Sequence, residues 1–135
     1  MSDGTLRAFG ILLALFQKSA PAIVVIEEPE TSLHPAAAAA IMEALRNASE
    51  DKQIIVSTHS PEILDMADAA EDELRVVTWQ KGLTSIGAVE GAARESLRTH
   101  LASAGELLRM RILDAPPLFD SKVDDGQLQL FVETP

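Results

Sequence analysis

Two acidic side chains follow directly after a short β-branched run. Residues 23–26 read Ile-Val-Val-Ile, and Glu27 and Glu28 come next. An unbroken run of this kind is typical of a strand covered on both faces, and ligands of open α/β sheets bind at the carboxyl ends of such strands. One carboxylate there can help to hold a hydrated Mg²⁺ while its neighbour orients or deprotonates an attacking water. A solvated acidic turn after a core strand is the alternative.

A histidine follows the second β-branched run. Residues 54–57 read Ile-Ile-Val-Ser, and Thr58 and His59 come directly afterwards. Because the carboxyl ends of parallel strands meet at one edge of a sheet, we expect His59 to lie beside Glu28. A histidine at that edge can donate a hydrogen bond to a terminal phosphate and keep a nucleophilic water in line. A single loop histidine is usually incidental, but two polar clusters at successive strand ends favour a phosphate pocket.

The elements that would position these side chains alternate between helix and strand. Helical patterns cover residues 5–18, 36–48, 61–66, 92–102 and 105–112, and strand patterns cover residues 23–26, 54–57, 74–79 and 83–86. The last two strands read as a hairpin, with Trp79 packed inside, and the arginines of the last two helices are expected on a solvated face. This order predicts an α/β fold: a mainly parallel sheet flanked by helices, with a C-terminal hairpin and helices. Residues 1–114 are assigned to this domain and residues 115–135 to a turn-rich tail.

Composition excludes several classes of protein. The hydrophobic fraction of 47% argues against a wholly disordered chain. The absence of cysteine excludes disulfides and thiolate metal sites and is compatible with a reducing cytoplasm, where we place the protein. The formal charge is −10 and the 11 basic residues are scattered, so this segment is not expected to grip DNA or RNA by itself. Any DNA contact would use regions outside this chain.

One apolar run needs an interpretation. Residues 8–16 are apolar and loosely mimic the core of a signal peptide, but Asp3 leaves the leading segment nearly neutral. Arg7 and Lys18 bracket far fewer than the ~20 apolar residues that a membrane-spanning helix needs. We therefore expect no membrane insertion.

Three motifs of this sequence resemble those of ABC-type ATPases, in the RecF- and SMC-like branch of the P-loop NTPase superfamily. Residues 27–35 (Glu-Glu-Pro-Glu-Thr-Ser-Leu-His-Pro) look like the acidic strand-end motif and the following D-loop, and residues 57–61 (Ser-Thr-His-Ser-Pro) look like the switch-histidine loop. Residues 2–7 (Ser-Asp-Gly-Thr-Leu-Arg) resemble the signature motif. The motifs keep the family's order and spacing over about residues 2–66. The resemblance implies a partial P-loop NTPase fold, the C-terminal half of an ABC-type head, with ATP and Mg²⁺ as cofactors.

The resemblance also implies roles at the strand ends. Glu28 corresponds to the carboxylate that activates or positions water, and His59 to the sensor of the γ-phosphate. Glu27 corresponds to the acid near Mg²⁺, where the wider family usually has Asp, so the longer side chain changes the metal geometry. Glu30 is given only a supporting role.

The remaining roles involve contact between two protomers. Ser32 and His34 resemble D-loop residues that meet a second protomer. Ser2 and Gly4 resemble signature residues that complete the nucleotide site of the other protomer, with backbone N–H groups and a helix N-terminus facing phosphate. Simple capping of the first helix by Ser2 is the alternative, and both roles are compatible.

The sequence contains no glycine-rich loop that ends in Lys-Ser/Thr, which a complete nucleotide site of this class needs. Lys18-Ser19 is the nearest pair, but it has no glycine-rich approach. The chain is therefore expected to be a truncated or partial ATPase that binds nucleotide weakly or not at all by itself and is inactive in isolation. The leading hypothesis is the catalytic lobe of an ATP hydrolase that pairs with itself or with a complete protomer across the nucleotide.

Two other functions are considered. One is a non-catalytic interaction or dimerisation module of a larger ATPase assembly. The other is a toprim-type nuclease, which also clusters acids at strand ends, but the Leu-His-Pro and Thr-His-Ser-Pro segments are not needed for that chemistry. Residues 103–109 are similar to C-terminal segments of this ATPase branch, and no chemical role follows from them.

Overall fold

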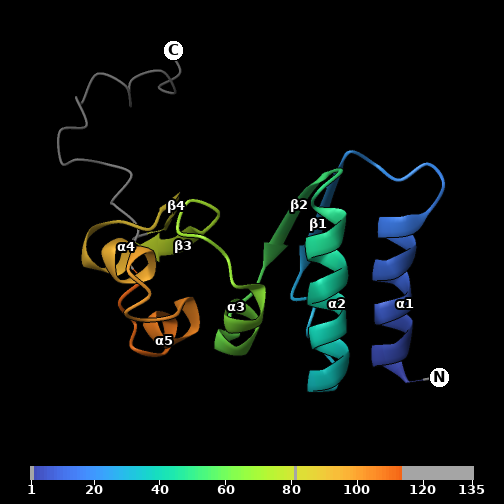
Figure 1. Ribbon diagram of the computed structural model, residues 1–135, viewed down its shortest axis with the longest axis horizontal. Helices are drawn as coiled ribbons and strands as arrows, with labels where there is room; N and C mark the ends of the chain where they lie inside the picture. The colour runs from blue at the N-terminus through green and yellow to red at the C-terminus, as the bar shows by residue number, and fades with distance from the viewer. Residues whose placement is uncertain (1, 81, 114–135) are drawn as a thin grey trace, which may run out of the picture.

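The computed structural model describes residues 2–80 and 82–113 (Figure 1). The elements follow in the order α1 (Asp3–Phe16), β1 (Ile23–Glu27), α2 (Pro35–Ala48), β2 (Gln53–Ser57), α3 (Pro61–Ala67), β3 (Arg75–Gln80), β4 (Leu83–Ala88), α4 (Gly91–Arg98) and α5 (Ala104–Arg109). The predicted α/β class is confirmed. The predicted tail, residues 115–135, lies outside the described residues, so the boundary at residue 114 stays a prediction.

The two β-branched runs pair as parallel strands. Their register runs from Ile23 opposite Gln53 to Glu27 opposite Ser57, so both strands end at the same edge. The N–H of Glu28 donates to the carbonyl of Ser57 at 2.8 Å, which extends the pairing one residue past the strand. This register brings the polar segments after β1 and β2 together.

Helices α1 and α2 cover one face of this parallel pair. They stand side by side in Figure 1, with β1 and β2 next to α2. Pro35 occupies the first turn of α2, where its missing N–H costs no hydrogen bond, and His34 caps the helix. The buried residues of this core are Ile11, Leu15, Val24, Ala38, Ile41, Met42, Leu45, Ala48 and Ile63. None of the helices within residues 2–80 and 82–113 is long and apolar enough to cross a membrane.

The opposite face of the parallel pair is uncovered among the described residues. Ile23, Val25 and Ile55 are 55%, 69% and 45% exposed. The prediction that these strands are covered on both faces is therefore met on one face only. Alternation along each strand explains the difference, because Val24 and Val25 of the same strand point to opposite sides. Helix α1 also exposes apolar side chains, at Leu6, Phe9, Leu12, Leu13 and Phe16.

The second half of the described chain has its own small core. Strands β3 and β4 form the predicted antiparallel hairpin, and Val89, Ala93 and Leu107 are buried beneath it. The prediction that Trp79 packs inside is wrong, since its side chain is 73% exposed. Helix α4 ends at Arg98 and α5 at Arg109, earlier than predicted. In each case a left-handed residue follows, His100 (φ 53°) or Arg111 (φ 58°), and such a backbone cannot continue a right-handed helix.

Candidate functional site

Glu28 and His59 meet at the carboxyl edge of the parallel strands. Glu28 follows β1 and His59 lies two residues after β2, and Nδ1 of His59 is 2.7 Å from Oε1 of Glu28. The Glu28 side chain is 26% exposed, whereas that of His59 is 89% exposed. The predicted juxtaposition of these two side chains is confirmed. Most of the His59 ring, which also carries Nε2, is exposed to solvent.

The backbone at Glu28 adopts an uncommon conformation. Its φ of 48° lies in the left-handed region, which costs a residue with a side chain roughly 1–2 kcal/mol. Arg7 of α1 stabilises this turn, because its Nη2 donates to the carbonyls of Glu27 at 2.6 Å and Glu28 at 2.8 Å. Backbone strain held in place by its surroundings is common at functional sites.

The two side chains favour each other's charged forms. Burial raises the pKa of Glu28, but the hydrogen bond with His59 and the charge on His59 together lower it below its ordinary value. The hydrogen bond to Glu28, and then its negative charge, raise the pKa of His59. Glu28 is therefore ionised at neutral pH and can only accept, so Nδ1 of His59 carries the shared proton.

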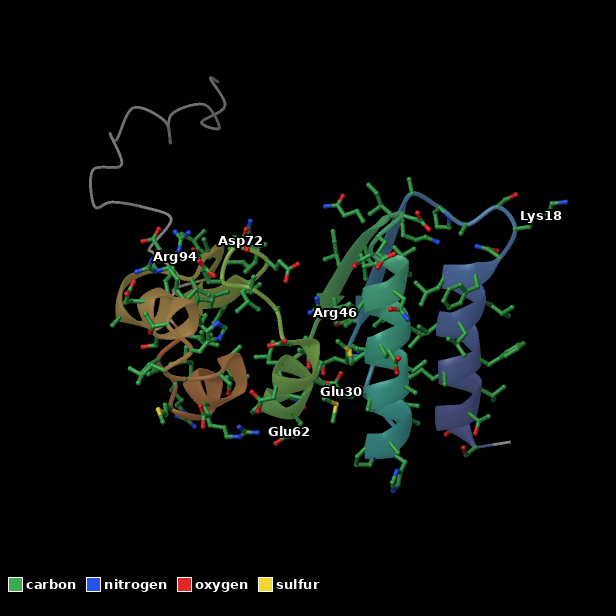
Figure 2. All side chains as sticks on the ribbon, in the orientation of Figure 1. Lys18, Glu30, Arg46, Glu62, Asp72 and Arg94 are labelled. Atoms are coloured by element: carbon green, nitrogen blue, oxygen red, sulfur yellow. The ribbon has the colours of Figure 1, made fainter. Side chains whose placement is uncertain are left out.

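A second polar contact links the same two loops. Thr58 Oγ1 donates to Oε1 of Glu30 at 2.5 Å, and the N–H of Ser60 donates to Thr58 Oγ1 at 3.0 Å. Figure 2 shows Glu30 close to α3. Lys18, the nearest match to a phosphate-loop lysine, lies past the carboxyl end of α1 and away from this site. Oε2 of Glu28 and Oε2 of Glu30 are buried and accept no hydrogen bond from residues 2–80 or 82–113. Such oxygens are costly, so they favour a donor such as an ordered water.

Glu27 is the candidate metal ligand. Its side chain is exposed, on the uncovered face of the strand pair with Val25. No group of three or more His, Asp or Glu side chains within the described ranges could hold a metal ion. Mg²⁺ keeps several waters and is usually held by one or two carboxylates together with substrate phosphates. The one exposed carboxylate of Glu27 is compatible with a hydrated Mg²⁺ whose other ligands are water and substrate phosphates.

The predicted protomer-contact residues lie together at the amino ends of α1 and α2. Ser2 caps α1, accepting from the N–H of Thr5 at 3.3 Å, and the ring of His34 accepts from the N–H of Ala36 at 3.3 Å. Ser2, Ser32 and His34 are exposed.

Gly4 differs from these three because it is buried. A Cβ at this position would lie 2.2 Å from the carbonyl oxygen of Ser32. The absence of a side chain thus lets α1 approach the loop after β1, and Gly4 has a packing role within this chain.

Sequence reasoning missed Arg7 and Thr58 as site residues. Arg7 had been noted as a flanking charge and as the last residue of the signature-like segment, with no contact assigned to it, and its contact spans about 20 positions in the chain. No local sequence pattern predicts a contact between residues so far apart in the chain. Thr58 could have been found, since it lies between a strand end and His59.

Parts of this chain are similar to known proteins. Residues 1–65 match the family described as "AAA domain, putative AbiEii toxin, Type IV TA system". The chain is 32% identical over 111 residues to Endonuclease GajA of Bacillus cereus (strain VD045), a match that covers 76% of this chain and 19% of that protein.

A solved structure shares the fold. It is described as "Structural biochemistry of ATP-driven dimerization and DNA stimulated activation of SMC ATPases", with a TM-score of 0.55 at 16% identity, covering 75% of this chain and 60% of that one. The chain thus spans about a fifth of the first relative and three fifths of the second. Taken together, the family match, the relative and the shared fold support a fragment of a RecF/SMC-like P-loop ATPase.

Proposed function

We propose that this chain supplies the hydrolytic side of an ATP site, with Glu28 positioning the attacking water and His59 binding the terminal phosphate. The observation that carries the proposal is the 2.7 Å contact between these side chains at the carboxyl edge of two parallel strands. Ligands of α/β sheets bind at this edge. The family match over residues 1–65 supports nucleotide as the ligand.

One carboxylate oxygen of Glu28 lacks a hydrogen-bond partner among the described residues. Oε1 is engaged by His59, whereas Oε2 is buried and has no partner in the part of the chain that the structure describes. The lowered pKa makes Glu28 a weak base but keeps it ionised. Phosphoryl transfer through a loose transition state depends on positioning more than on basicity, so an ionised carboxylate that orients water suits the reaction.

His59 can act on both sides at once. Its Nδ1 donates to Glu28, and its raised pKa favours the form that also carries a proton on Nε2. That second N–H can donate to a phosphate oxygen while the first holds the carboxylate in place. The cationic ring then stabilises the negative charge on the transferred phosphoryl group.

Mg²⁺ and the phosphates need further ligands. Glu27 is the proposed carboxylate for a hydrated Mg²⁺, which would neutralise phosphate charge when bound. No glycine-rich Lys-Ser/Thr loop occurs in the sequence, so we assign the phosphate-holding loop to residues outside it. The uncovered face at Val25 and Ile55 supports this assignment, because parallel strands are ordinarily covered on both faces.

We further propose that the site is completed across a dimer, with this chain or a complete protomer as partner. Ser2, Ser32 and His34 are exposed and lie at one end of the molecule, so a second protomer can reach them. Gly4 would act indirectly, by letting α1 pack against Ser32.

DNA contact is assigned to surfaces outside this segment. Several arginines are already engaged in contacts within the chain: Arg7, Arg46, Arg75, Arg98 and Arg109. Together with the formal charge of −10, this leaves little basic surface for the phosphates of a duplex.

The test is Mg²⁺-dependent ATP hydrolysis by this chain joined to a polypeptide that supplies the phosphate-holding loop. Glu28→Gln keeps the size of the side chain but removes its charge, and should lower turnover by about 10²-fold or more while ATP remains bound. His59→Ala should lower turnover about tenfold or more. Glu43→Gln is the matched control, since Glu43 is an exposed carboxylate of α2. Full turnover in Glu28→Gln would exclude Glu28 as the water-positioning group.

A second candidate function is favoured by the exposed apolar surface. Val25 and Ile55 on the strands, and Phe9 and Phe16 on α1, are all at least 45% exposed. A non-catalytic module that docks on a larger ATPase assembly would use such a surface. This alternative predicts stable association of the joined protein with its partner but no hydrolysis, whatever residue occupies position 28.

A further inference from the structure

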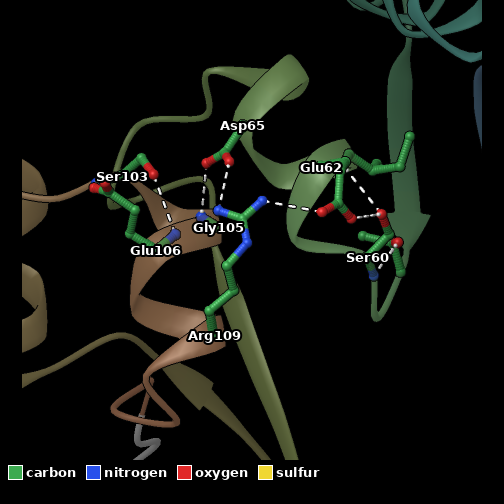
Figure 3. Close-up of polar contacts among 9 residues, drawn as sticks. Ser60, Glu62, Asp65, Ser103, Gly105, Glu106 and Arg109 are labelled. Carbon is green, nitrogen blue, oxygen red and sulfur yellow. Dashed lines mark hydrogen bonds and ion pairs between the residues drawn. The ribbon is translucent and has the colours of Figure 1, made fainter. Parts of the chain in front are cut away.

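Residues 103–109 form the helix α5 and its cap, directly against α3. The cap is reciprocal: Ser103 Oγ accepts from the N–H of Glu106 at 3.1 Å, and Oε2 of Glu106 accepts from the N–H of Ser103 at 2.9 Å. This capping box fixes the start of the helix. Figure 3 shows the helix start facing Asp65 of α3.

Gly105 brings the two helices into backbone contact. Its N–H donates to Oδ1 of Asp65 at 3.0 Å. A Cβ at position 105 would lie 2.3 Å from the carbonyl oxygen of Pro61 and 2.3 Å from Oδ1 of Asp65. Only glycine fits this approach without a shift, and the contact reaches the first residue of α3.

Arg109, one turn further on, bridges two carboxylates of α3. One guanidinium nitrogen donates to Oδ2 of Asp65 and another to Oε1 of Glu62, both at 3.1 Å (Figure 3). Glu62 in turn accepts from Ser60 Oγ at 3.0 Å. Ser60 caps α3 and directly follows His59, so a continuous set of contacts joins Arg109 to the histidine loop.

We propose that residues 103–109 are a positioning element for His59, in which Gly105 and Arg109 hold the start of α3 and thereby fix how the histidine meets Glu28. This inference rests on the function proposed above only in treating the Glu28–His59 contact as part of a catalytic site. The contact needs such support because the His59 side chain is 89% exposed, so the packing of its own side chain does little to hold it. Arg109 is a positioning residue, because it touches neither of the two proposed catalytic side chains.

The expected effect of losing Arg109 is local. The Arg109 side chain is 45% exposed and that of Glu62 is 63% exposed, and exposed ion pairs contribute little to stability. Arg109→Gln should therefore leave the chain folded but loosen the residues around Ser60. A looser loop weakens the hydrogen bond that raises the pKa of His59.

The measurement is an NMR titration of the His59 ring in the whole chain, without nucleotide. Arg109→Gln should lower the pKa of His59 toward the value found in Glu28→Gln. Removal of a positive charge would by itself raise the pKa of a nearby histidine, so the sign of the shift separates positioning from simple electrostatics. Arg98→Gln is the matched control, because it removes the same charge from an ion pair with Glu95 on α4 and should leave His59 unchanged.

An unchanged or raised His59 pKa in folded Arg109→Gln would overturn the proposal. Arg109→Lys keeps the positive charge but cannot bond both carboxylates as a guanidinium does, so it should give a His59 pKa between those of wild type and Arg109→Gln. If Arg109→Gln does not fold, a wild-type His59 pKa in Arg109→Lys overturns the proposal. The NMR titration requires no ATP, so failure of hydrolysis in the joined protein would not change its result. Likewise, an unchanged His59 pKa would not exclude hydrolysis by the joined protein.

Discussion

Two glycines of α1 provide a test of how the signature segment packs against the loop after β1. Gly4 and Gly10 lie in the same helix, so replacement by Ala changes helix propensity at both. A Cβ at Gly4 would lie 2.2 Å from the carbonyl oxygen of Ser32, whereas a Cβ at Gly10 would meet no described residue within 4 Å. The two substitutions therefore differ mainly in one contact.

The magnitudes follow from this difference. Ala is favoured over Gly inside a helix by about 0.8–1 kcal/mol, so Gly10→Ala should raise the free energy of unfolding by about that amount. At Gly4 the clash is with backbone, which cannot rotate away, and overpacking of this kind costs about 1–3 kcal/mol. After the gain in propensity, Gly4→Ala should be destabilised by roughly 0–2 kcal/mol. The difference between the two variants, about 1–3 kcal/mol, measures the contact with Ser32.

The assay is urea unfolding of the whole chain, followed by circular dichroism, with the midpoint and slope fitted for both variants. A higher midpoint is expected for Gly10→Ala, and an unchanged or lower midpoint for Gly4→Ala. If Gly4→Ala stabilises the chain as much as Gly10→Ala does, Gly4 is not held against Ser32, and the packing role assigned to it is wrong.

Three further outcomes are expected. Arg7→Gln removes two donors from the strand-end carbonyls and should lower the free energy of unfolding by about 1–3 kcal/mol in urea unfolding; wild-type stability would count against the role of Arg7. Val24→Ala, on the covered face, should cost about 1–3 kcal/mol, whereas Val25→Thr on the uncovered face should be close to neutral, and equal losses would contradict the assignment of faces. The Glu28–His59 pair should stabilise the chain most between pH ~4.5 and ~6.5. The pKa of His59 is raised in the folded chain, so its contribution to stability is complete below its unfolded pKa and is lost as pH rises through its folded pKa. The pKa of Glu28 is lowered, so its contribution to stability is complete above its unfolded pKa and is lost as pH falls through its folded pKa. The difference in stability between wild type and His59→Gln, measured across pH, tests this window, and a difference independent of pH would refute it.

The sequence predicts the centre of the site well because two simple rules determine it. β-branched runs predict strands, and parallel strands end at one edge, so the acid after the first strand and the histidine after the second are expected at the same edge. The observed register, Glu27 opposite Ser57, is what makes Glu28 and His59 neighbours. The catalytic roles given to these side chains remain proposals.

The supporting contacts could not be predicted, because they depend on tertiary approach. Arg7 reaches carbonyls about 20 residues away, and Arg109 pairs with carboxylates more than 40 residues away. Arg109 had been expected on a solvated face, and it is partly exposed, yet both of its contacts are with α3. The same limit explains α4: its composition favours helix up to residue 102, but the turn at His100 ends it sooner.

The parallel pair has a consequence for handling the protein. Within the described residues β1 and β2 pair only with each other, so each leaves one row of backbone donors and acceptors open beside an apolar face. Open rows of this kind accept any extended segment, including the same strand of another copy. The formal charge of −10 opposes such encounters, and added salt shortens the range of that repulsion. In added salt, copies of this chain joined through the open edges of β1 and β2 would then compete with the proposed dimer.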